Sequence, residues 1–259
     1  MTEGSMNLTE QAVVVTGAGS GMGKATACRL VRRNALVAAL DIVAEPVLSL
    51  TQELGGLGIE CDVGSESSAR AAIQRVVAEL GAPRVLVNCA GIAPAQRISG
   101  RKGPHDLDLF QKVIRTNLVG TFNMIRLVAE EMKQLDPVGE SGARGVIINT
   151  ASVAAYEGQI GQAAYSASKG GVVALTLPAA RELAQFGIRV VTVAPGLIGT
   201  PMLHAMPEEV QISLANQVPF PRRLGNADEF AALVEHIIDN ELLNGEVIRL
   251  DGAIRMNPK

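Results

Sequence analysis

Short aliphatic runs alternate along this chain with longer stretches whose apolar residues recur every three or four positions. The pattern predicts seven strands, at residues 11–17, 35–41, 58–63, 84–91, 144–152, 187–196 and 245–252. It predicts helices between them, at residues 23–33, 44–54, 65–80, 107–133, 164–186 and 227–240. Such alternation favours right-handed βαβ crossovers. We therefore expect a single α/β domain over residues 1–259, doubly wound, with a seven-stranded, mostly parallel sheet and helices on both faces.

The composition agrees with such a sheet and narrows the range of partners. Hydrophobic residues make up 47% of the chain and aromatic residues only 3%, so the core must be aliphatic, as in parallel strands covered on both sides. The net charge is −3 and both signs are scattered, which disfavours nucleic acid and an anionic membrane as partners. No run has the form of a secretory leader or the length of a membrane span, so we expect a cytoplasmic location.

Cysteine and histidine give no sign of a disulfide framework or a metal site. No cysteine belongs to a CxxC pair, so we expect reduced thiols at Cys28, Cys61 and Cys89. The histidines do not cluster, so we expect no metal at His105, His204 and His236.

The segment "TGAGSGMG", residues 16–23, joins the first expected strand to the first expected helix. Glycines let a backbone approach a pyrophosphate closely, and the amides of a helix N-terminus then face its charge. A tight turn would by itself explain the glycines equally well. Between a strand and a helix, however, the segment predicts a dinucleotide site of the Rossmann type, with contacts from Gly17, Ser20, Gly21, Met22 and Gly23.

Asp41 lies twenty residues after Gly21, at the end of the second expected strand. A carboxylate at this point can accept hydrogen bonds from ribose hydroxyls and repels a 2′-phosphate, so NAD is favoured over NADP. Ile42, which follows and is expected beside the cofactor, offers a phosphate no charge. The alternative is that Asp41 caps the next helix.

Further cofactor contacts are expected where the other strands end, because ligands of open α/β sheets bind at the carboxyl ends of strands. Asp62 would bind the adenine amine, and Thr200 the nicotinamide carboxamide or a phosphate. Asn88 serves either the cofactor or a turn of the main chain. The remaining contacts expected at these strand ends are Val63, Ala90, Gly91, Pro195, Gly196 and Ile198.

Tyr165 and Lys169 lie four positions apart in an expected helix and so share one face. A nearby ammonium lowers the pKa of a phenol from its ordinary value near 10. We expect Lys169 to do this for Tyr165, which then exchanges a proton with a substrate oxygen. A polar pair on an exposed helix is the alternative. Ser152, at the end of the fifth strand, would hold the same oxygen. Asn117, a poor helix former, would divert a backbone carbonyl to a water.

Residues 203–218 follow the loop after the sixth expected strand and have an amphipathic pattern. We expect a substrate lid around residues 200–220 that orders on substrate. Ordinary core packing is the alternative. The apolar residues expected to line this lid are Leu203, Met206, Val210, Ile212 and Leu214.

Taken together, "TGAGSGMG", "NCAG", "YSASK" and "PGLIGT", with Asn117 and Ser152, resemble the short-chain dehydrogenase/reductase family over residues 7–258. The resemblance implies a catalytic tetrad of Asn117, Ser152, Tyr165 and Lys169. In it, Tyr165 is the acid and base, Ser152 orients a carbonyl, Lys169 lowers the phenol pKa and binds the nicotinamide ribose, and Asn117 holds a relay water. The resemblance also implies a homotetramer in which the long fourth and fifth helices pack between subunits.

Three longer stretches are similar to a branch of this family that acts on 3-hydroxyacyl-CoA thioesters and some steroids. They are "GVIINTASVAAYEGQIGQAAYSASKGG", "QVPFPRRLG" and "LNGEVIRLDGAIRMNP". The resemblance implies an NAD-dependent oxidoreductase that interconverts a secondary alcohol and a ketone, with an acyl-CoA as its substrate. It places Gln162 in contact with the substrate, where a polar helix-start residue is the alternative. Residues 95–106 depart from the branch and leave the acyl preference open.

Other functions stay open at this point. A 3-oxoacyl-carrier-protein reductase or a hydroxysteroid dehydrogenase would use the same residues, although such reductases often prefer NADPH, which Asp41 disfavours. A non-catalytic NAD-bound scaffold is a further alternative, but it has no need of Tyr165 or Lys169.

Overall fold

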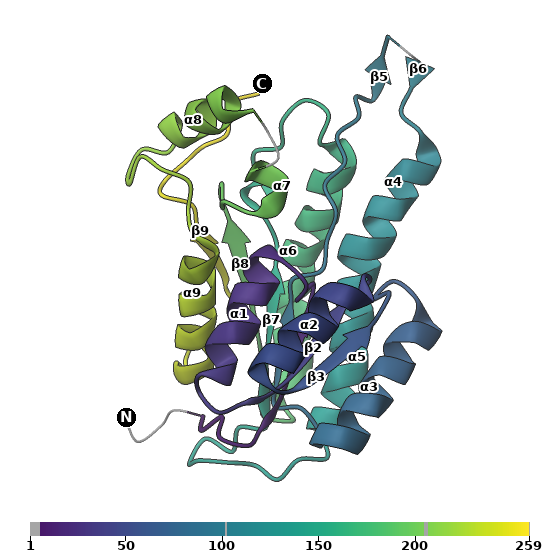
Figure 1. Ribbon diagram of the computed structural model, residues 1–259, viewed down its shortest axis with the longest axis vertical. Coiled ribbons are helices and arrows are strands. Elements are labelled where there is room, and N and C mark those ends of the chain that lie inside the picture. Colours follow the sequence, from purple (N-terminus) through teal and green to yellow (C-terminus); the bar gives the residue numbers. More distant parts are fainter. Residues whose placement is uncertain (1–5, 102, 205–206, 259) are drawn as a thin grey trace.

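The computed structural model describes residues 6–101, 103–204 and 207–258, and its main feature is a parallel sheet (Figure 1). Seven strands form this sheet in the order β3-β2-β1-β4-β7-β8-β9, and every pairing is parallel. The strands are β1 (Ala12–Thr16), β2 (Leu36–Asp41), β3 (Leu57–Glu60), β4 (Val85–Asn88), β7 (Gly145–Thr150), β8 (Ile188–Pro195) and β9 (Val247–Leu250). The strand order reverses between β1 and β4, so the sheet is doubly wound, as predicted.

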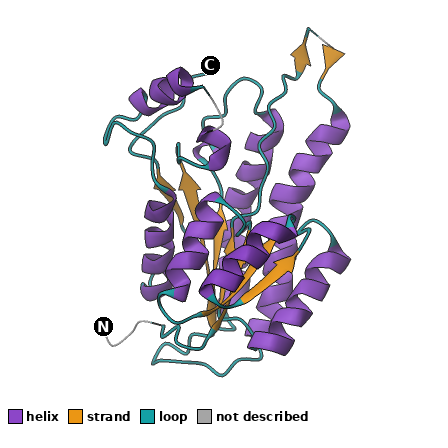
Figure 2. Cartoon of the chain, viewed as in Figure 1, coloured by secondary structure: helices purple, strands orange, loops and turns teal. Residues whose placement is uncertain are grey.

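Helices cover both faces of the sheet (Figure 2). One face carries α1 (Gly21–Val31), α2 (Ala44–Leu54) and α9 (Ala227–Asp239). The other carries α3 (Glu66–Leu80), α5 (Gly120–Met132) and α6 (Ala163–Ala184). Strand β1 shows how one strand serves two cores: Val13 and Val15 pack in the first, and Val14 packs in the second. Successive side chains of a strand point to opposite faces, so both faces need apolar residues. The predicted fold class is confirmed.

The helix expected at residues 107–133 is divided into three segments. They are α4 (Leu107–Ile114), the π-helical turn η1 (Arg115–Val119) and α5. The N–H of Gly120 donates to the carbonyl of Arg115, five residues back. A π-turn inserts into a helix in this way and is frequently found at functional sites. Asn117 lies within this turn.

Several short elements lie at the carboxyl end of the sheet. The loop after β4 carries the hairpin of β5 (Ser99–Gly100) and β6 (Gly103–Pro104), which projects at the top of Figure 1. The short helix η2 (Val153–Ala155) follows β7, and α7 (Pro201–His204) and α8 (Glu208–Asn216) occupy the region expected to form a lid. Within the described residues, no helix combines the length and the apolar character needed to cross a membrane.

Candidate active site

A cavity of about 670 Å³ opens at the carboxyl ends of the central strands. This volume is typical of small-molecule sites. Most residues of the predicted site line it: Gly17, Ser20, Gly21, Met22, Gly23, Asp41, Ile42, Asp62, Val63, Ala90, Gly91, Ser152, Gln162, Tyr165, Lys169, Pro195, Gly196, Ile198 and Thr200. Asn88 and Asn117, although the structure describes them, are not among the lining residues.

The glycine loop has the shape that the sequence predicts. Gly17 and Gly21 have φ angles of 64° and 51°, in the left-handed region that favours glycine. A Cβ on Gly23 would overlap the carbonyl of Gly17. Gly21 also begins α1, whose first amides have no partner within the helix. The loop is therefore a cradle free of side chains at a helix N-terminus, and a pyrophosphate fits such a cradle.

Asp41 lines the cavity and also holds the main chain on both sides of it, whereas its contact with a cofactor ribose stays a prediction. Its Oδ2 accepts a hydrogen bond from the amide of Gly19 at 3.0 Å, which ties β2 to the glycine loop. Its Oδ1 accepts one from the amide of Val43, the N-cap residue of α2, at 3.1 Å. The carboxylate thus orders the main chain on both sides of it while it lines the cavity.

Asp62 is held in place by a cation that the sequence did not point to. Its Oδ2 lies 2.7 Å from Nη2 of Arg115, and its Oδ1 accepts a hydrogen bond from the amide of Gly64 at 2.9 Å. Arg115 is the first residue of η1. The π-turn is therefore tied directly to the wall of the cavity.

Asn88 is buried away from the cavity lining and pairs with another asparagine, while a cofactor contact stays a prediction. Its Nδ2 donates to Oδ1 of Asn149 at 2.9 Å, and both side chains are buried between β4 and β7. The loop after β4 is instead shaped by Thr16, whose Oγ1 accepts hydrogen bonds from the amides of Cys89 and Ala90 at 3.1 and 3.2 Å. This role of Thr16 was not expected, because in the sequence Thr16 has the pattern of an ordinary strand residue.

Tyr165 and Ser152 face the same cavity, as predicted. The direction expected for the pKa of the phenol was wrong. Burial raises the pKa of Tyr165 above its ordinary value, and a hydrogen bond with Ser152 offsets part of this. Lys169 is not among the causes of this shift; its Nζ lies over the ring of Tyr165, 5.9 Å from the centroid. Tyr165 is therefore a neutral phenol at pH 7, able to donate a proton.

Lys169 is a buried cation beside the cavity. Its Nζ donates to the carbonyl of Thr150 at 2.6 Å. Burial lowers the pKa of Lys169 from 10.5 to about 8, so the side chain is still mostly charged at pH 7. Desolvation raises the pKa of the neighbouring thiol of Cys89 to about 11, although this residue is only partly buried.

Asn117 supports the site from behind its wall. Its Oδ1 accepts a hydrogen bond from the amide of Ile92 at 2.8 Å, and its Nδ2 donates to the carbonyl of Ile92 at 2.9 Å. A Cβ on Gly91 would lie 3.3 Å from this Oδ1 and 3.6 Å from Nζ of Lys169, so the two side chains flank the same glycine. The main-chain carbonyl of Asn117 accepts a hydrogen bond from the hydroxyl of Thr121 at 2.7 Å. A water on this carbonyl stays a prediction.

The region expected to form a lid is only partly directed at the cavity. Leu203 and Leu214 line it, as expected. Val210 and Ile212 are exposed instead, because α8 is a surface helix with no buried residue among those described. Met206 lies outside the described residues. Ordering of this segment on substrate stays a prediction.

Gln162 lines the cavity together with residues that the sequence analysis missed. Its Oε1 accepts a hydrogen bond from the amide of Gln159 at 3.0 Å. Gln159 itself lines the cavity, and so does Met256 from the chain after β9. The neighbourhood of Gln162 was a signal for Gln159, whereas nothing local in the sequence connects Met256 to this site.

Comparisons with known proteins agree with this arrangement. A family model described as short chain dehydrogenase matches residues 11–211. The chain is 55% identical over 252 residues to 3-hydroxyacyl-CoA dehydrogenase type-2 of Bos taurus, covering 95% of each chain. It is 34% identical over 258 residues to (3R)-3-hydroxyacyl-CoA dehydrogenase of Homo sapiens, covering 94% of this chain and 95% of that one. The crystal structure of 3-hydroxyacyl-CoA dehydrogenase type-2 from Mycobacterium avium matches with a TM-score of 0.91 at 44% identity, covering 96% of this chain and 97% of that one.

Proposed function

The chain belongs to the short chain dehydrogenase family, and on that premise we propose that it interconverts 3-hydroxyacyl-CoA and 3-oxoacyl-CoA with NAD as its cofactor. The observation that carries the proposal is that Ser152, Tyr165 and Lys169 line one cavity with the glycine loop. A proton donor and a cradle for a dinucleotide thus open onto the same cavity, where a substrate could meet both. The relatives named above supply the acyl-CoA class.

The cofactor is held, in this proposal, by main chain at one end and by carboxylates at the other. Gly17, Gly21 and Gly23 cradle the pyrophosphate, since a Cβ on Gly23 would overlap neighbouring backbone. Asp41 receives the adenosine ribose, and its charge disfavours a 2′-phosphate there. When bound, the dinucleotide would donate a hydride to the substrate carbon in reduction and accept it from that carbon in oxidation.

The side chains of this protein handle the proton. In the reductive direction, Tyr165 donates its phenolic proton to the oxygen of the 3-oxo group, and Ser152 holds that oxygen. Burial keeps Tyr165 protonated, which suits this direction at neutral pH. In the oxidative direction Tyr165 must first lose its proton, so oxidation should be favoured as the pH rises. The ammonium of Lys169 is held beside the cavity by its hydrogen bond to the carbonyl of Thr150, and its positive charge favours a negative charge on the substrate oxygen.

The alternatives fit the described site less well. A reductase that prefers NADPH would place a phosphate beside the carboxylate of Asp41. A scaffold without turnover would keep Lys169 charged and buried for no gain, although burying a charge is costly. A hydroxysteroid dehydrogenase needs the same catalytic residues, and a panel of substrates separates it from the acyl-CoA enzyme.

We also propose a homotetramer and a cytoplasmic location for this protein. The homotetramer is supported by exposed apolar side chains on the two long helices, Phe122 on α5 and Leu177 on α6. The cytoplasmic location stays a prediction from the sequence.

Replacement of Tyr165 by phenylalanine tests the proposal. Reduction of acetoacetyl-CoA by NADH should slow by at least about 100-fold, because a general acid contributes a factor of roughly 100 to 10,000. The dissociation constant of NADH should change less than about twofold. Tyr156→Phe is the matched control, because Tyr156 is the other tyrosine of the chain and is half exposed. Tyr165→Phe with most of its activity left would refute the assignment.

A further inference from the structure

The chain after β9 folds back over the loop of residues 152–165, which leads from the end of β7 into α6. The amide of Ile160 donates to the carbonyl of Pro258 at 3.0 Å. The side-chain amide of Gln159 donates to the carbonyl of Asn257, also at 3.0 Å. In Figure 1 the chain after β9 runs towards the end of the sheet at which the cavity opens. The C-terminal segment is thus part of the site's surroundings.

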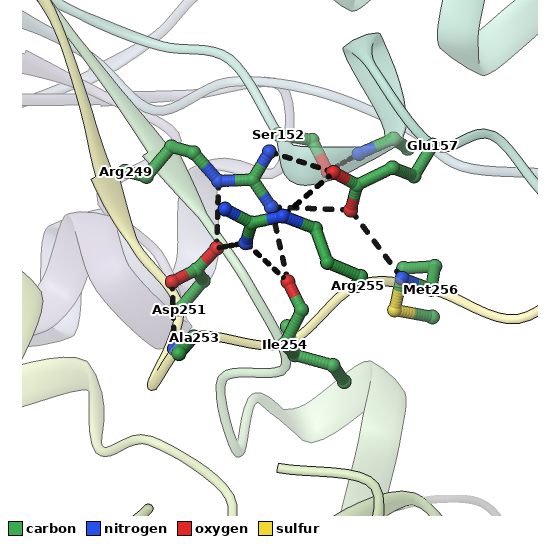
Figure 3. Close-up of polar contacts among 9 residues, drawn as sticks. Ser152, Glu157, Arg249, Asp251, Ala253, Ile254, Arg255 and Met256 are labelled. Atoms are coloured by element: carbon green, nitrogen blue, oxygen red, sulfur yellow. Dashed lines mark hydrogen bonds and ion pairs between the residues drawn. The ribbon is translucent and has the colours of Figure 1, made fainter. Parts of the chain in front are cut away.

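Four charged side chains hold this segment, as Figure 3 shows. Glu157 and Arg249 form a bidentate pair, with Oε1 accepting from Nη1 at 2.9 Å and Oε2 from Nη2 at 3.1 Å. Asp251 lies 2.7 Å from Nε of Arg249 and 3.2 Å from Nη1 of Arg255. The side chains of Glu157, Arg249 and Asp251 are only 22%, 24% and 8% exposed. Fork-shaped contacts of this kind fix orientation as well as distance.

The cluster reaches the cavity through its neighbours. The amide of Met256 donates to Oε2 of Glu157 at 3.3 Å, and Met256 lines the cavity. Gln159 lines it from the facing loop and donates to Gln162, the N-cap residue of α6. This helix carries Tyr165. The Glu157–Arg249 pair therefore connects the two walls that carry Met256 and Gln159, next to the catalytic helix.

The other side of the cluster contacts the loops around the cofactor and the lid. A Cβ on Gly196 would lie 2.9 Å from Cα of Asp251, so the loop after β8 packs directly on the cluster. The amide of Phe220, just beyond α8, donates to the carbonyl of Gly252 at 3.4 Å. One polar cluster thus joins the catalytic loop, the loop after β8 and the end of the lid region.

We propose that the Glu157–Arg249 pair is a positioning device for the substrate, which holds Met256 and Gln159 as the wall that receives the acyl end of the thioester. This rests on the proposed function. Neither residue touches the reacting atoms. The pair acts by fixing the wall, so its loss weakens binding of the acyl substrate and leaves the dinucleotide cradle on the far strands unchanged.

The chain offers a matched control for this pair. Arg29 and Glu235 form an ion pair of 2.5 Å between α1 and α9, with side chains 28% and 26% exposed. Neither residue lines the described cavity. Glu235→Gln therefore removes a comparable ion pair with no path to the substrate wall.

Kinetics with acetoacetyl-CoA and NADH provide the first test. We expect Glu157→Gln to raise the KM for acetoacetyl-CoA about tenfold, with kcat lowered less than about threefold and the dissociation constant of NADH unchanged. Arg249→Lys should do the same, because lysine keeps the charge and loses the bidentate geometry. The double variant should be no worse than either single one, since the two residues act as a unit. Glu235→Gln should leave the KM as it is.

Hydrogen exchange of the backbone amides at residues 156–162, with NADH bound, gives a readout that needs no turnover. Exchange should be faster in Glu157→Gln and Arg249→Lys than in wild type, and unchanged in Glu235→Gln. The proposal is overturned if KM and exchange stay at wild-type values, or if Glu235→Gln raises the KM equally. If the wild type does not reduce acetoacetyl-CoA, the proposed function fails, and the exchange data alone decide whether the pair holds the wall. If Glu157→Gln does not fold, Arg249→Lys carries both tests.

Discussion

Replacing Lys169 by methionine should make the protein more stable at pH 7 while it removes activity. Burial lowers the pKa of Lys169 from 10.5 to about 8. At about 1.4 kcal/mol per pH unit, this difference amounts to about 3 kcal/mol against the charged form in the fold. Methionine has a similar length and no charge. It gives up the hydrogen bond to the carbonyl of Thr150, and an unpaired carbonyl costs roughly 1–3 kcal/mol. The balance favours the variant by about 1 kcal/mol.

The pH dependence makes this prediction sharper, because its sign follows from the direction of the pKa. A lowered lysine pKa means that the folded state releases its proton at a lower pH than the unfolded chain. Between pH 8 and 10.5 the unfolded chain therefore binds more protons, and the stability of the wild type rises with pH. From pH 7 to 10 the free energy of unfolding of the wild type should rise by about 2 kcal/mol relative to that of Lys169→Met. The order of stability should thus reverse.

Urea unfolding followed by far-UV circular dichroism at pH 7 and pH 10 measures both quantities. Lys24→Met is the control, because Lys24 lies exposed on α1 and its replacement should give a difference that does not vary with pH in this way. A Lys169→Met variant that is less stable than wild type at pH 7, by an amount that stays constant to pH 10, would refute the reasoning. It would mean that the ammonium is solvated or compensated more fully than its burial implies.

Two other predictions test the cofactor end and the surface. Asp41→Asn should improve binding of NADPH relative to NADH by at least about fivefold, because a like-charge contact of this kind costs about 1 kcal/mol or more. Titration with both dinucleotides measures this ratio, and an unchanged ratio would remove the basis for assigning NAD. Glu229→Gln should lower stability by roughly 0.5–1 kcal/mol near pH 6, because glutamine can still accept the hydrogen bond of the Asn226 amide in the capping box of α9 but loses the ion pair with Arg223. Pairing with Arg223 lowers the pKa of Glu229 to about 2, so this difference should fade as the pH falls from about 4.5 towards 2, although solvent screens a side chain that is 43% exposed. Thermal melts of both proteins across this range check it, and a difference that persists at the lowest pH would contradict it.

The fold could be predicted because its signals are local. Strand and helix periodicity depends on close neighbours all along the chain, and the glycine loop and Asp41 lie within the first βαβ unit, where sequence neighbours are also neighbours in space. The same holds for Tyr165 and Lys169, which share a helix face as predicted. The direction of the phenol pKa could not be obtained in this way. Spacing along a helix shows which residues share a face, but not how far the phenol is buried, and burial is the main cause of the raised pKa.

Long-range partners account for the rest of what the sequence left open. Asn88 is paired with Asn149, 61 residues further along, and does not line the described cavity. Met256 and Glu157 are 99 residues apart and meet only after β9 has joined the sheet. In the lid region a local pattern was misleading. The amphipathic pattern of α8 predicted that Val210 and Ile212 would line the lid, but both are exposed, and only one edge of the helix faces the cavity.

The π-helical turn at Arg115–Val119 fixes the rotational phase of everything that follows it in α5. Each residue of an α-helix advances by about 100° around the axis, so one residue removed from the turn would rotate the whole of α5 by that angle. Phe122 would leave solvent, and Met124 would leave the core in which it is fully buried. Alignments of relatives should therefore place length changes outside this junction, in loops such as residues 133–144. A natural variant that lacks one residue here would have had to rebuild a complete helical interface.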